Sequence, residues 1–172
     1  AQSYHRTVLG SSIPKYTFSL SGGMGYKGVD FTMQLQGVAG VKGYLNNFAG
    51  YAFFQEGNIQ RWQADNRFRP DQPDRYAKYP RLEAIPGTGT ANTEVSDYWL
   101  RDASYLRIKN VQIGYTLPKQ WLPQISSLRL YLSGDNLYTF NKYPKGWDPE
   151  INTGGAFYPI LRTITFGLNF SL

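Results

Sequence analysis

The sequence predicts an all-β protein, and three features of the chain support this class. Five stretches alternate apolar with polar residues, which is the period of a β-strand. Aromatic residues make up 16% of the chain, with 14 Tyr, 10 Phe and 4 Trp, and such residues favour strands. No run of 18 apolar residues exists, so we expect no transmembrane helix, whereas a membrane-spanning strand needs only about 9 to 11 alternating residues.

The first two strands are expected at about 15–21 and 28–44, joined by a glycine-rich turn. The turn contains Gly23-x-Gly25-x-x-Gly28, the glycine spacing of a dinucleotide-binding loop. Such a loop needs a helix after it, because the helix N-terminus holds the pyrophosphate. The residues after Gly28 alternate as a strand instead, so we expect a hairpin turn and no cofactor.

A long irregular stretch, about 46–100, separates the second strand from the third, which is expected at about 103–117. The third strand changes its apolar face at Lys109-Asn110, and this slip predicts a β-bulge. A loop as long as 46–100 is usually functional or disordered.

The fourth strand is expected at about 128–140 and the last at about 160–172. The connections therefore differ in length along the chain. Short links alternate with long loops, the former at 21–27 and 118–127 and the latter at 46–100 and 139–158.

This asymmetry fits two architectures, and the alternation alone does not decide between them. In a transmembrane barrel, short turns are periplasmic, long loops are external, apolar residues face lipid and polar residues face the lumen. Five polar residues would then face the lumen: Asp30, Gln34, Arg107, Lys109 and Arg129. Five aromatic residues would form interfacial girdles: Tyr115, Trp121, Tyr138, Phe140 and Tyr158. In a soluble β-sandwich, one face would cover a core and the aromatic loops would bind carbohydrate.

Composition argues against catalysis, metal binding and nucleic-acid binding. The chain has no Cys and one His, His5, so neither a thiol nucleophile nor a zinc cluster is expected. The net charge of +6 arises partly from a basic, aromatic stretch at 61–81, a mixture that single-strand binders use. Acidic residues and prolines interrupt this stretch, which favours a solvated loop. Asp148 and Glu150 lie too close in sequence for an opposed glycosidase pair, so we expect no enzyme.

Several motifs, in order along nearly the whole chain, resemble the SusC/RagA family of TonB-linked outer-membrane transporters. The longest is Tyr98-Trp-Leu-Arg-Asp-Ala-Ser-Tyr-Leu-Arg-Ile-Lys-Asn110 with its continuation to Pro118. The others are Pro14-Lys-Tyr-Thr-Phe18, Tyr26-Lys-Gly-Val-Asp-Phe31, Tyr79-Pro-Arg81, Tyr131-Leu-Ser-Gly-Asp-Asn-Leu137, Trp147-Asp-Pro-Glu150, Tyr158-Pro159 and Thr163-Ile-Thr-Phe-Gly-Leu-Asn-Phe170.

The resemblance implies a large barrel, with 22 strands in this family, that closes around an N-terminal plug. Residues 1–172 would supply about the last five strands as a C-terminal segment of a longer chain, because five strands cannot close a barrel. It further implies TonB-driven import of oligosaccharides, or alternatively oligopeptides, across the outer membrane of a Gram-negative bacterium. A SusD-like surface lipoprotein would cover the barrel, TonB would bind elsewhere on the chain, and the loops 46–100 and 139–158 would be extracellular.

Candidate contacts to substrate or lipoprotein come from the long loops, since flat rings stack on sugar faces and Arg binds carboxylate or sulfate groups. These candidates are Trp62, Phe68, Arg69, Tyr76, Tyr79, Trp99 and Trp147. The alternative is that the rings pack the loops internally and that the Arg side chains pair with neighbouring Asp residues.

Overall fold

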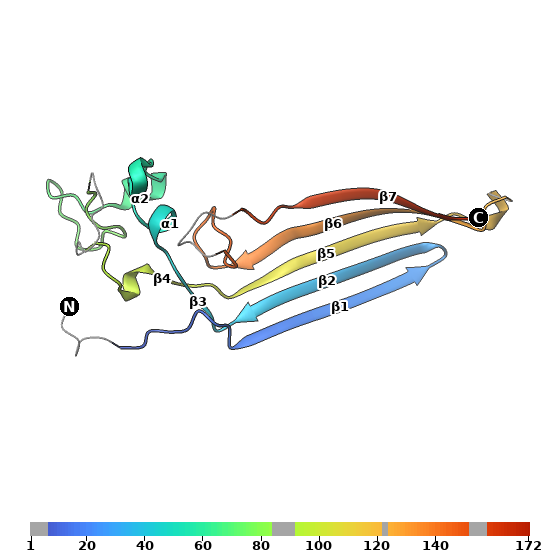
Figure 1. Cartoon of the computed structure of the whole chain (residues 1–172), viewed down its shortest axis with the longest axis horizontal. Helices are drawn as coiled ribbons and strands as arrows, with labels where there is room; N and C mark the ends of the chain where they lie inside the picture. The colour runs from blue at the N-terminus through green and yellow to red at the C-terminus, as the bar shows by residue number, and fades with distance from the viewer. Residues whose placement is uncertain (1–6, 84–91, 122–123, 152–157) are drawn as a thin grey trace. The chain divides into compact units, whose positions relative to one another are not determined.

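The main feature of the computed structural model, which describes residues 7–83, 92–121, 124–151 and 158–172, is an antiparallel five-stranded sheet (Figure 1). The strands pair in the order β1-β2-β5-β6-β7. Their bounds are β1 Tyr16–Tyr26, β2 Val29–Ala39, β5 Tyr105–Thr116, β6 Ser127–Asn141 and β7 Thr163–Ser171. The expected all-β class and the five principal strands are confirmed, while His5 lies outside the described residues.

The chain divides into two compact units, which are described separately. The sheet unit comprises residues 10–42, 102–149 and 158–172, and the loop unit is built mainly from residues 43–101. The stretch expected to be irregular is thus partly folded. Its elements are α1 Asn47–Gly50, η2 Phe54–Glu56, α2 Arg61–Asn66 and η3 Asp97–Trp99, and it is flanked by the two-stranded ladder of β3 Lys42–Tyr44 and β4 Leu100–Asp102.

The β1–β2 hairpin closes with a tighter turn than the sequence predicts. The glycines before Tyr26 lie inside β1, and the turn consists only of Lys27 and Gly28, with Tyr26 paired to Val29. Both turn residues have positive φ, 48° and 85°, as in a type I′ turn, whose twist matches that of the paired strands. The predicted link at 21–27 is therefore wrong, because Met24 and Tyr26 continue the apolar alternation through the glycines.

The second strand is shorter than expected, and the third contains the expected bulge. β2 ends at Ala39, Gly40 turns the chain with φ of +71°, and Lys42 starts the separate strand β3. In the β2–β5 register, Gln34 pairs with Asn110 and Leu35 with Ile108, so Lys109 is the extra residue. The bulge prediction is confirmed.

One face of the sheet unit is apolar across all its strands. A single row, read from β1 to β7 through the register, consists of Met24, Phe31, Ile113, Leu132 and Phe166. Met24 and Phe166 are 74% and 69% exposed. This face is therefore exposed rather than covered as in a sandwich, so the sandwich alternative is wrong.

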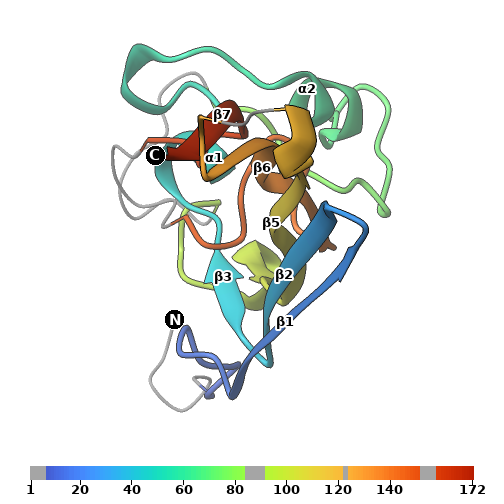
Figure 2. The same ribbon diagram turned by 90° about the vertical axis from the view of Figure 1, so that its right-hand side faces the viewer.

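The opposite face is polar, as the alternation predicts. The row beside the apolar one consists of Gly23, Thr32, Gln112, Ser133 and Thr165. The register places Asp30, Gln34, Arg107 and Arg129 on this face as expected, whereas Lys109 sits at the bulge, where the alternation does not fix its direction. Figure 2, which looks along the strands, shows the sheet open, with β1 and β7 at its edges.

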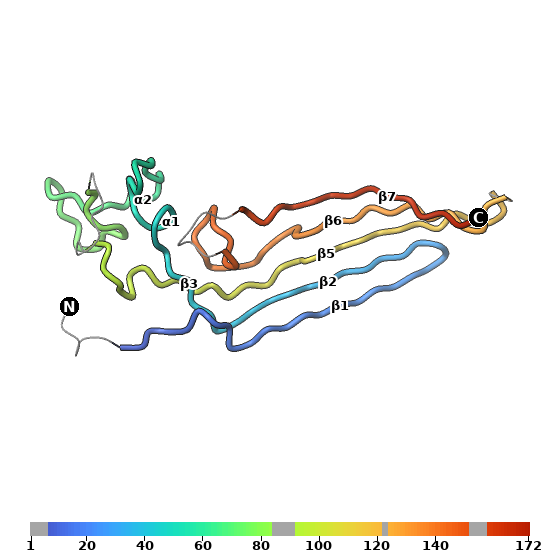
Figure 3. Tube along the Cα trace, viewed as in Figure 1, coloured from blue at the N-terminus to red at the C-terminus, as the bar shows by residue number. Residues whose placement is uncertain are grey.

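The two short links leave one end of the sheet, and the two long connections leave the other (Figure 3). The predicted girdle residues are exposed near strand ends. Tyr115 and Trp121 belong to the end with short links, and Tyr138, Phe140 and Tyr158 belong to the end with long connections. The rings of Tyr138 and Phe140 lie edge to face with centroids 4.7 Å apart. Among the described helices, none is long and apolar enough to cross a membrane.

Candidate functional site

The loop unit has an aromatic core centred on Trp99, which is 2% exposed. Its ring lies edge to face with Tyr98, Tyr51 and Tyr79 at centroid distances of 4.7, 5.2 and 6.1 Å. The Leu45 amide donates to the Trp99 carbonyl at 2.9 Å, and the indole Nε1 donates to the Asn92 carbonyl at 3.1 Å. Aromatic pairs of this geometry stabilise a core beyond the area they bury.

A single backbone carbonyl, that of Gly50, connects three parts of this unit. It accepts hydrogen bonds from the Tyr79 hydroxyl at 2.8 Å and from Gln63 Nε2 at 2.9 Å. The same hydroxyl accepts the Ala52 N–H at 2.9 Å, and burial raises the pKa of Tyr79. Gln63 is fully buried, so its amide is satisfied inside the core rather than by water.

Helix α2 begins with a reciprocal cap that also orients Trp62. Gln60 and Gln63 exchange side-chain and backbone hydrogen bonds across the first turn, which satisfies two donors that a helix start leaves unpaired. The Trp62 indole donates to Gln60 Oε1 at 2.8 Å, and its ring lies edge to face with Tyr79 at 5.3 Å. Trp62 is therefore half-buried against the core.

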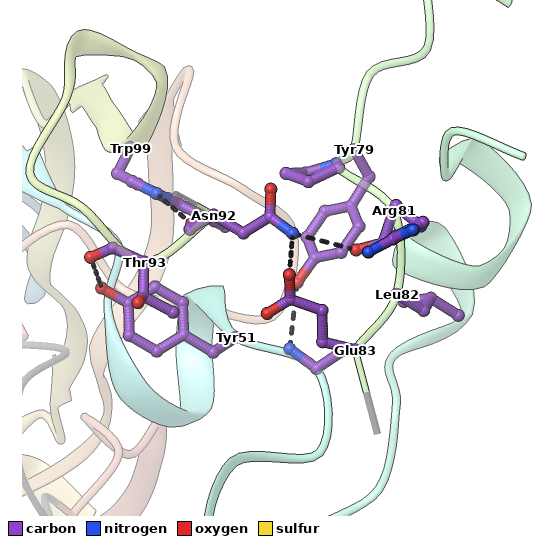
Figure 4. A pocket seen from close by; sticks show the side chains of 10 residues that line it. Tyr51, Tyr79, Arg81, Leu82, Glu83, Asn92, Thr93 and Trp99 are labelled. Atoms are coloured by element: carbon purple, nitrogen blue, oxygen red, sulfur yellow. Dashed lines mark hydrogen bonds between the residues drawn. The ribbon is translucent and has the colours of Figure 1, made fainter. Parts of the chain in front are cut away.

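A pocket opens beside this core, and Figure 4 shows its lining by Tyr51, Tyr79, Glu83, Asn92 and Trp99. Asn92 Nδ2 donates to Glu83 Oε1 at 2.7 Å and to the Arg81 carbonyl at 3.3 Å. The cavity volume is about 20 Å³, which holds about one water molecule. The pocket is therefore too small for a sugar ring or a peptide side chain.

The basic tip of the loop unit, residues 67–78, is exposed and partly charge-paired. Arg69 bonds the Asp71 carboxylate through Nη2 at 2.6 Å, and this hydrogen bond lowers the pKa of Asp71. Tyr76 is 78% exposed, with the Arg75 guanidinium 5.5 Å from its ring centroid. The loop unit thus presents cations and one aromatic ring to solvent at this point.

The seven predicted contact residues do not form one cluster. Trp62, Tyr79 and Trp99 pack inside the loop unit, Phe68 is half-buried, and Arg69 and Tyr76 are exposed on the tip. Trp147 belongs to the sheet unit and is half-buried. For Tyr79 and Trp99, the geometry favours the alternative in which the rings pack the loop internally.

Two charged pairs lie on the polar face of the sheet unit. The Arg129 guanidinium bonds Asp30 with Nε–Oδ2 of 2.8 Å and Nη2–Oδ1 of 2.5 Å, reaching across β5. It passes over Gly114, where a Cβ would lie 2.5 Å from both Arg129 Nη2 and Asp30 Oδ2. A Cβ at this position would therefore force the ends of the two side chains to shift.

The second pair is buried and was not predicted. Arg107 Nη2 bonds both oxygens of Asp148 at 2.7 and 2.6 Å, and its Nε donates to Thr139 Oγ1 at 2.9 Å. The Arg107 side chain is 1% exposed and that of Asp148 21%. This pair fastens the second long loop to the polar face.

The described residues contain no group of three or more acidic, His or Cys side chains that would bind a metal ion.

The sequence analysis also missed an aromatic turn at residues 46–60, which contains Phe48, Phe53 and Phe54. The signal was present as the phenylalanine-rich run, but the run carries no periodicity.

No protein-family model matches the chain. It is 28% identical over 186 residues to the TonB-dependent receptor P3 of Formosa agariphila, a match that covers 95% of this chain and 17% of that receptor. It is 30% identical over 156 residues to the TonB-dependent receptor SusC of Bacteroides thetaiotaomicron, covering 89% of this chain and 14% of SusC.

Among solved structures, the RagAB peptide importer in the closed-closed state matches with a TM-score of 0.74 and 26% identity. The match covers 96% of this chain and 18% of that chain. The open-open state of the same importer gives a TM-score of 0.71.

This chain belongs to the SusC/RagA family of TonB-dependent receptors. It spans less than a fifth of the length of each relative named above and corresponds to their C-terminal part. In this family the five-stranded sheet is a section of a large antiparallel outer-membrane barrel. The family's members are receptors and transporters rather than enzymes.

Proposed function

We propose that the receptor containing this chain imports oligosaccharides across the outer membrane as the SusC-like subunit of a complex with a SusD-like lipoprotein. TonB would supply energy through segments outside these 172 residues. The chain itself performs no catalysis. Its sheet unit forms part of the barrel wall, and the loops 46–100 and 139–158 extend outside the cell.

The observation that carries this proposal is the division of the sheet into one apolar and one polar face. The row from Met24 to Phe166 presents side chains of up to 74% exposure across all five strands. Apolar surface of this extent is unfavourable in water and favourable against lipid acyl chains. The edges of β1 and β7 then pair with further strands, because unpaired backbone groups find no partner in lipid.

The polar face would line the lumen, and its charges are arranged as pairs. Asp30 with Arg129, and Arg107 with Asp148, each combine one positive and one negative group. Such pairing gives this section of wall a polar surface without a large net charge. A neutral, wet wall suits passage of hydroxyl-rich molecules.

A specific observation also favours a second candidate, import of oligopeptides. The solved structures quoted above are of a peptide importer, and they match 96% of this chain. Aromatic and Arg side chains of the loop unit bind peptide side chains as readily as sugars. The proposal of an oligosaccharide rests on the likeness to SusC.

The test is uptake by cells that express the full-length receptor together with its SusD-like partner lipoprotein. Fluorescent maltoheptaose, xylohexaose and a hexa-alanine peptide would be supplied separately, with a strain lacking TonB as control. We expect TonB-dependent uptake of an oligosaccharide but not of the peptide. Uptake of the peptide alone would establish the second candidate and reject the first.

A further inference from the structure

The aromatic turn, residues 46–60, has an unusual backbone. Four non-glycine residues within it adopt left-handed φ angles: Asn47 at 48°, Phe53 at 58°, Gln55 at 47° and Glu56 at 61°. Only two other non-glycine residues among those described have positive φ. Such conformations are unfavourable, above all for a bulky residue, and persist only where the surroundings fix them.

Hydrogen bonds from the core of the loop unit fix the backbone of the turn. Gln60 Nε2 donates to the Phe48 carbonyl at 3.0 Å, and Gln63 and Tyr79 both donate to the Gly50 carbonyl. The Tyr79 hydroxyl also accepts the Ala52 N–H. The strained backbone is therefore held by buried polar side chains from α2 and from the segment that precedes η3.

The outer side presents aromatic rings next to amide groups. Phe48 is 46% exposed and lies edge to face with Phe54 at 5.0 Å. Gln55 and Asn58 are exposed, and a Cβ on Gly57 would lie 4.0 Å from Phe48 Cε1, so the chain that carries Asn58 passes this ring. Between residues 43 and 60 the only charged side chain is Glu56.

We propose that the aromatic turn is a subsite for an uncharged sugar unit of the transported oligosaccharide, an inference that rests on the proposed function. Phe48 stacks on the apolar face of the sugar ring, with Phe54 behind it. The amides of Gln55 and Asn58 bond the hydroxyl groups, since each amide both donates and accepts hydrogen bonds. Because the backbone is fixed before the ligand arrives, little ordering is required on binding.

The chemistry of the turn distinguishes it from the basic tip. An anionic ligand would require cations, and the turn has none. The tip has them, but Arg69 is already paired with Asp71, and Arg75 lies against Tyr76. The turn is therefore the better fit for a neutral ligand.

The experiment measures binding of maltoheptaose, xylohexaose, trigalacturonate and a hexa-alanine peptide to the purified complex of full-length receptor and lipoprotein by titration calorimetry. Phe48→Ala is compared with Val95→Ala, which shortens an exposed apolar side chain of the same unit outside the turn. We expect Phe48→Ala to weaken binding of a neutral oligosaccharide at least tenfold and Val95→Ala to leave it within twofold. Phe48→Trp, which keeps a flat ring, should retain binding.

The outcomes separate failure of the subsite from failure of the function. If the native complex binds a neutral oligosaccharide and Phe48→Ala binds it equally well, the subsite is rejected and the proposed function stands. If the native complex binds only the peptide, both are rejected. Binding of trigalacturonate alone rejects the neutral subsite. Should Phe48→Ala fail to fold, Gln55→Ala and Asn58→Ala at exposed positions decide, with an expected loss of at least threefold for each.

Discussion

Arg107 and Asp148 form a two-pronged ion pair between β5 and a loop 41 residues further along the chain. Because the Arg107 side chain is 1% exposed, protein groups rather than water surround its charge. The pair therefore holds the segment after β6 onto the polar face of the sheet. The pair therefore stabilises the local conformation of the long loop that contains Asp148.

Replacement of Asp148 by Asn removes the carboxylate charge that faces the buried Arg107 guanidinium. Removal of one partner of a buried pair typically costs about 3–5 kcal/mol, so local opening of the loop should increase at least tenfold. Trypsin should then cleave faster after Lys142 and Lys145, which are exposed residues of this segment. The control is Asp71→Asn, whose pair with Arg69 is exposed and should contribute little to stability. Equal cleavage rates in native protein and Asp148→Asn would contradict the role of the pair.

Gly114→Ala should disturb the bridge between Asp30 and Arg129. The new methyl group would lie 2.5 Å from the ends of both side chains, so one or both must shift and the ion pair is weakened. We expect a lower unfolding temperature of the detergent-extracted receptor. Gly22→Ala is the matched control, because a Cβ there meets nothing within 4 Å on the same sheet. A loss of stability in Gly22→Ala as large as in Gly114→Ala would argue against the close approach as the cause.

Tyr79→Phe tests the hydrogen bonds that brace the aromatic turn. The substitution keeps the ring against Trp62 and Trp99 but leaves the Ala52 N–H without its acceptor, at a cost of about 1–3 kcal/mol. Hydrogen exchange should become faster at residues 47–56. Tyr76→Phe, at an exposed position, should leave the exchange rates unchanged. Protection equal to the native protein in Tyr79→Phe would show that packing alone holds the turn.

The loop unit should lose stability in strong alkali. Burial raises the pKa of Tyr98, and separately of Tyr44, from about 10 to about 12. A tyrosine with a raised folded-state pKa contributes stability that is complete below pH 10 and is lost as the pH rises from 10 toward 12. Tyr98 also donates its hydroxyl proton to the Lys78 carbonyl at 2.6 Å, a bond that ionisation removes. Absorbance of the phenolate and Trp fluorescence should change together above pH 10, and a smaller change is expected in Tyr98→Phe.

The two faces of the sheet were predictable from sequence, but the contacts made by the loops were not. Alternation alone placed Ile113 and Leu132 on one face and Arg129 on the other, because a strand reverses its side chains at every residue. The hairpin turn was misplaced because glycine occurs both in strands and in turns, and only the apolar alternation through Met24 and Tyr26 separates the two.

The loop residues carry no such period. Trp99 was predicted as a candidate contact residue, with internal packing as the alternative, and it lies at the centre of a core. The order of residues in the chain does not reveal which rings face inward. Arg107 and Asp148 are too distant in sequence for any local pattern to connect them. The left-handed backbone at Phe53 is likewise a result of tertiary packing, which overrides the preference of the residue itself.

The hydrogen bond from Leu45 to Trp99 joins the two ends of an inserted segment more than 50 residues long. Because the two ends of the segment lie next to each other, a change of its length or sequence need not move the strands before and after it. Leu45 and Trp99 are accordingly suitable end points for transferring the segment from one receptor to another.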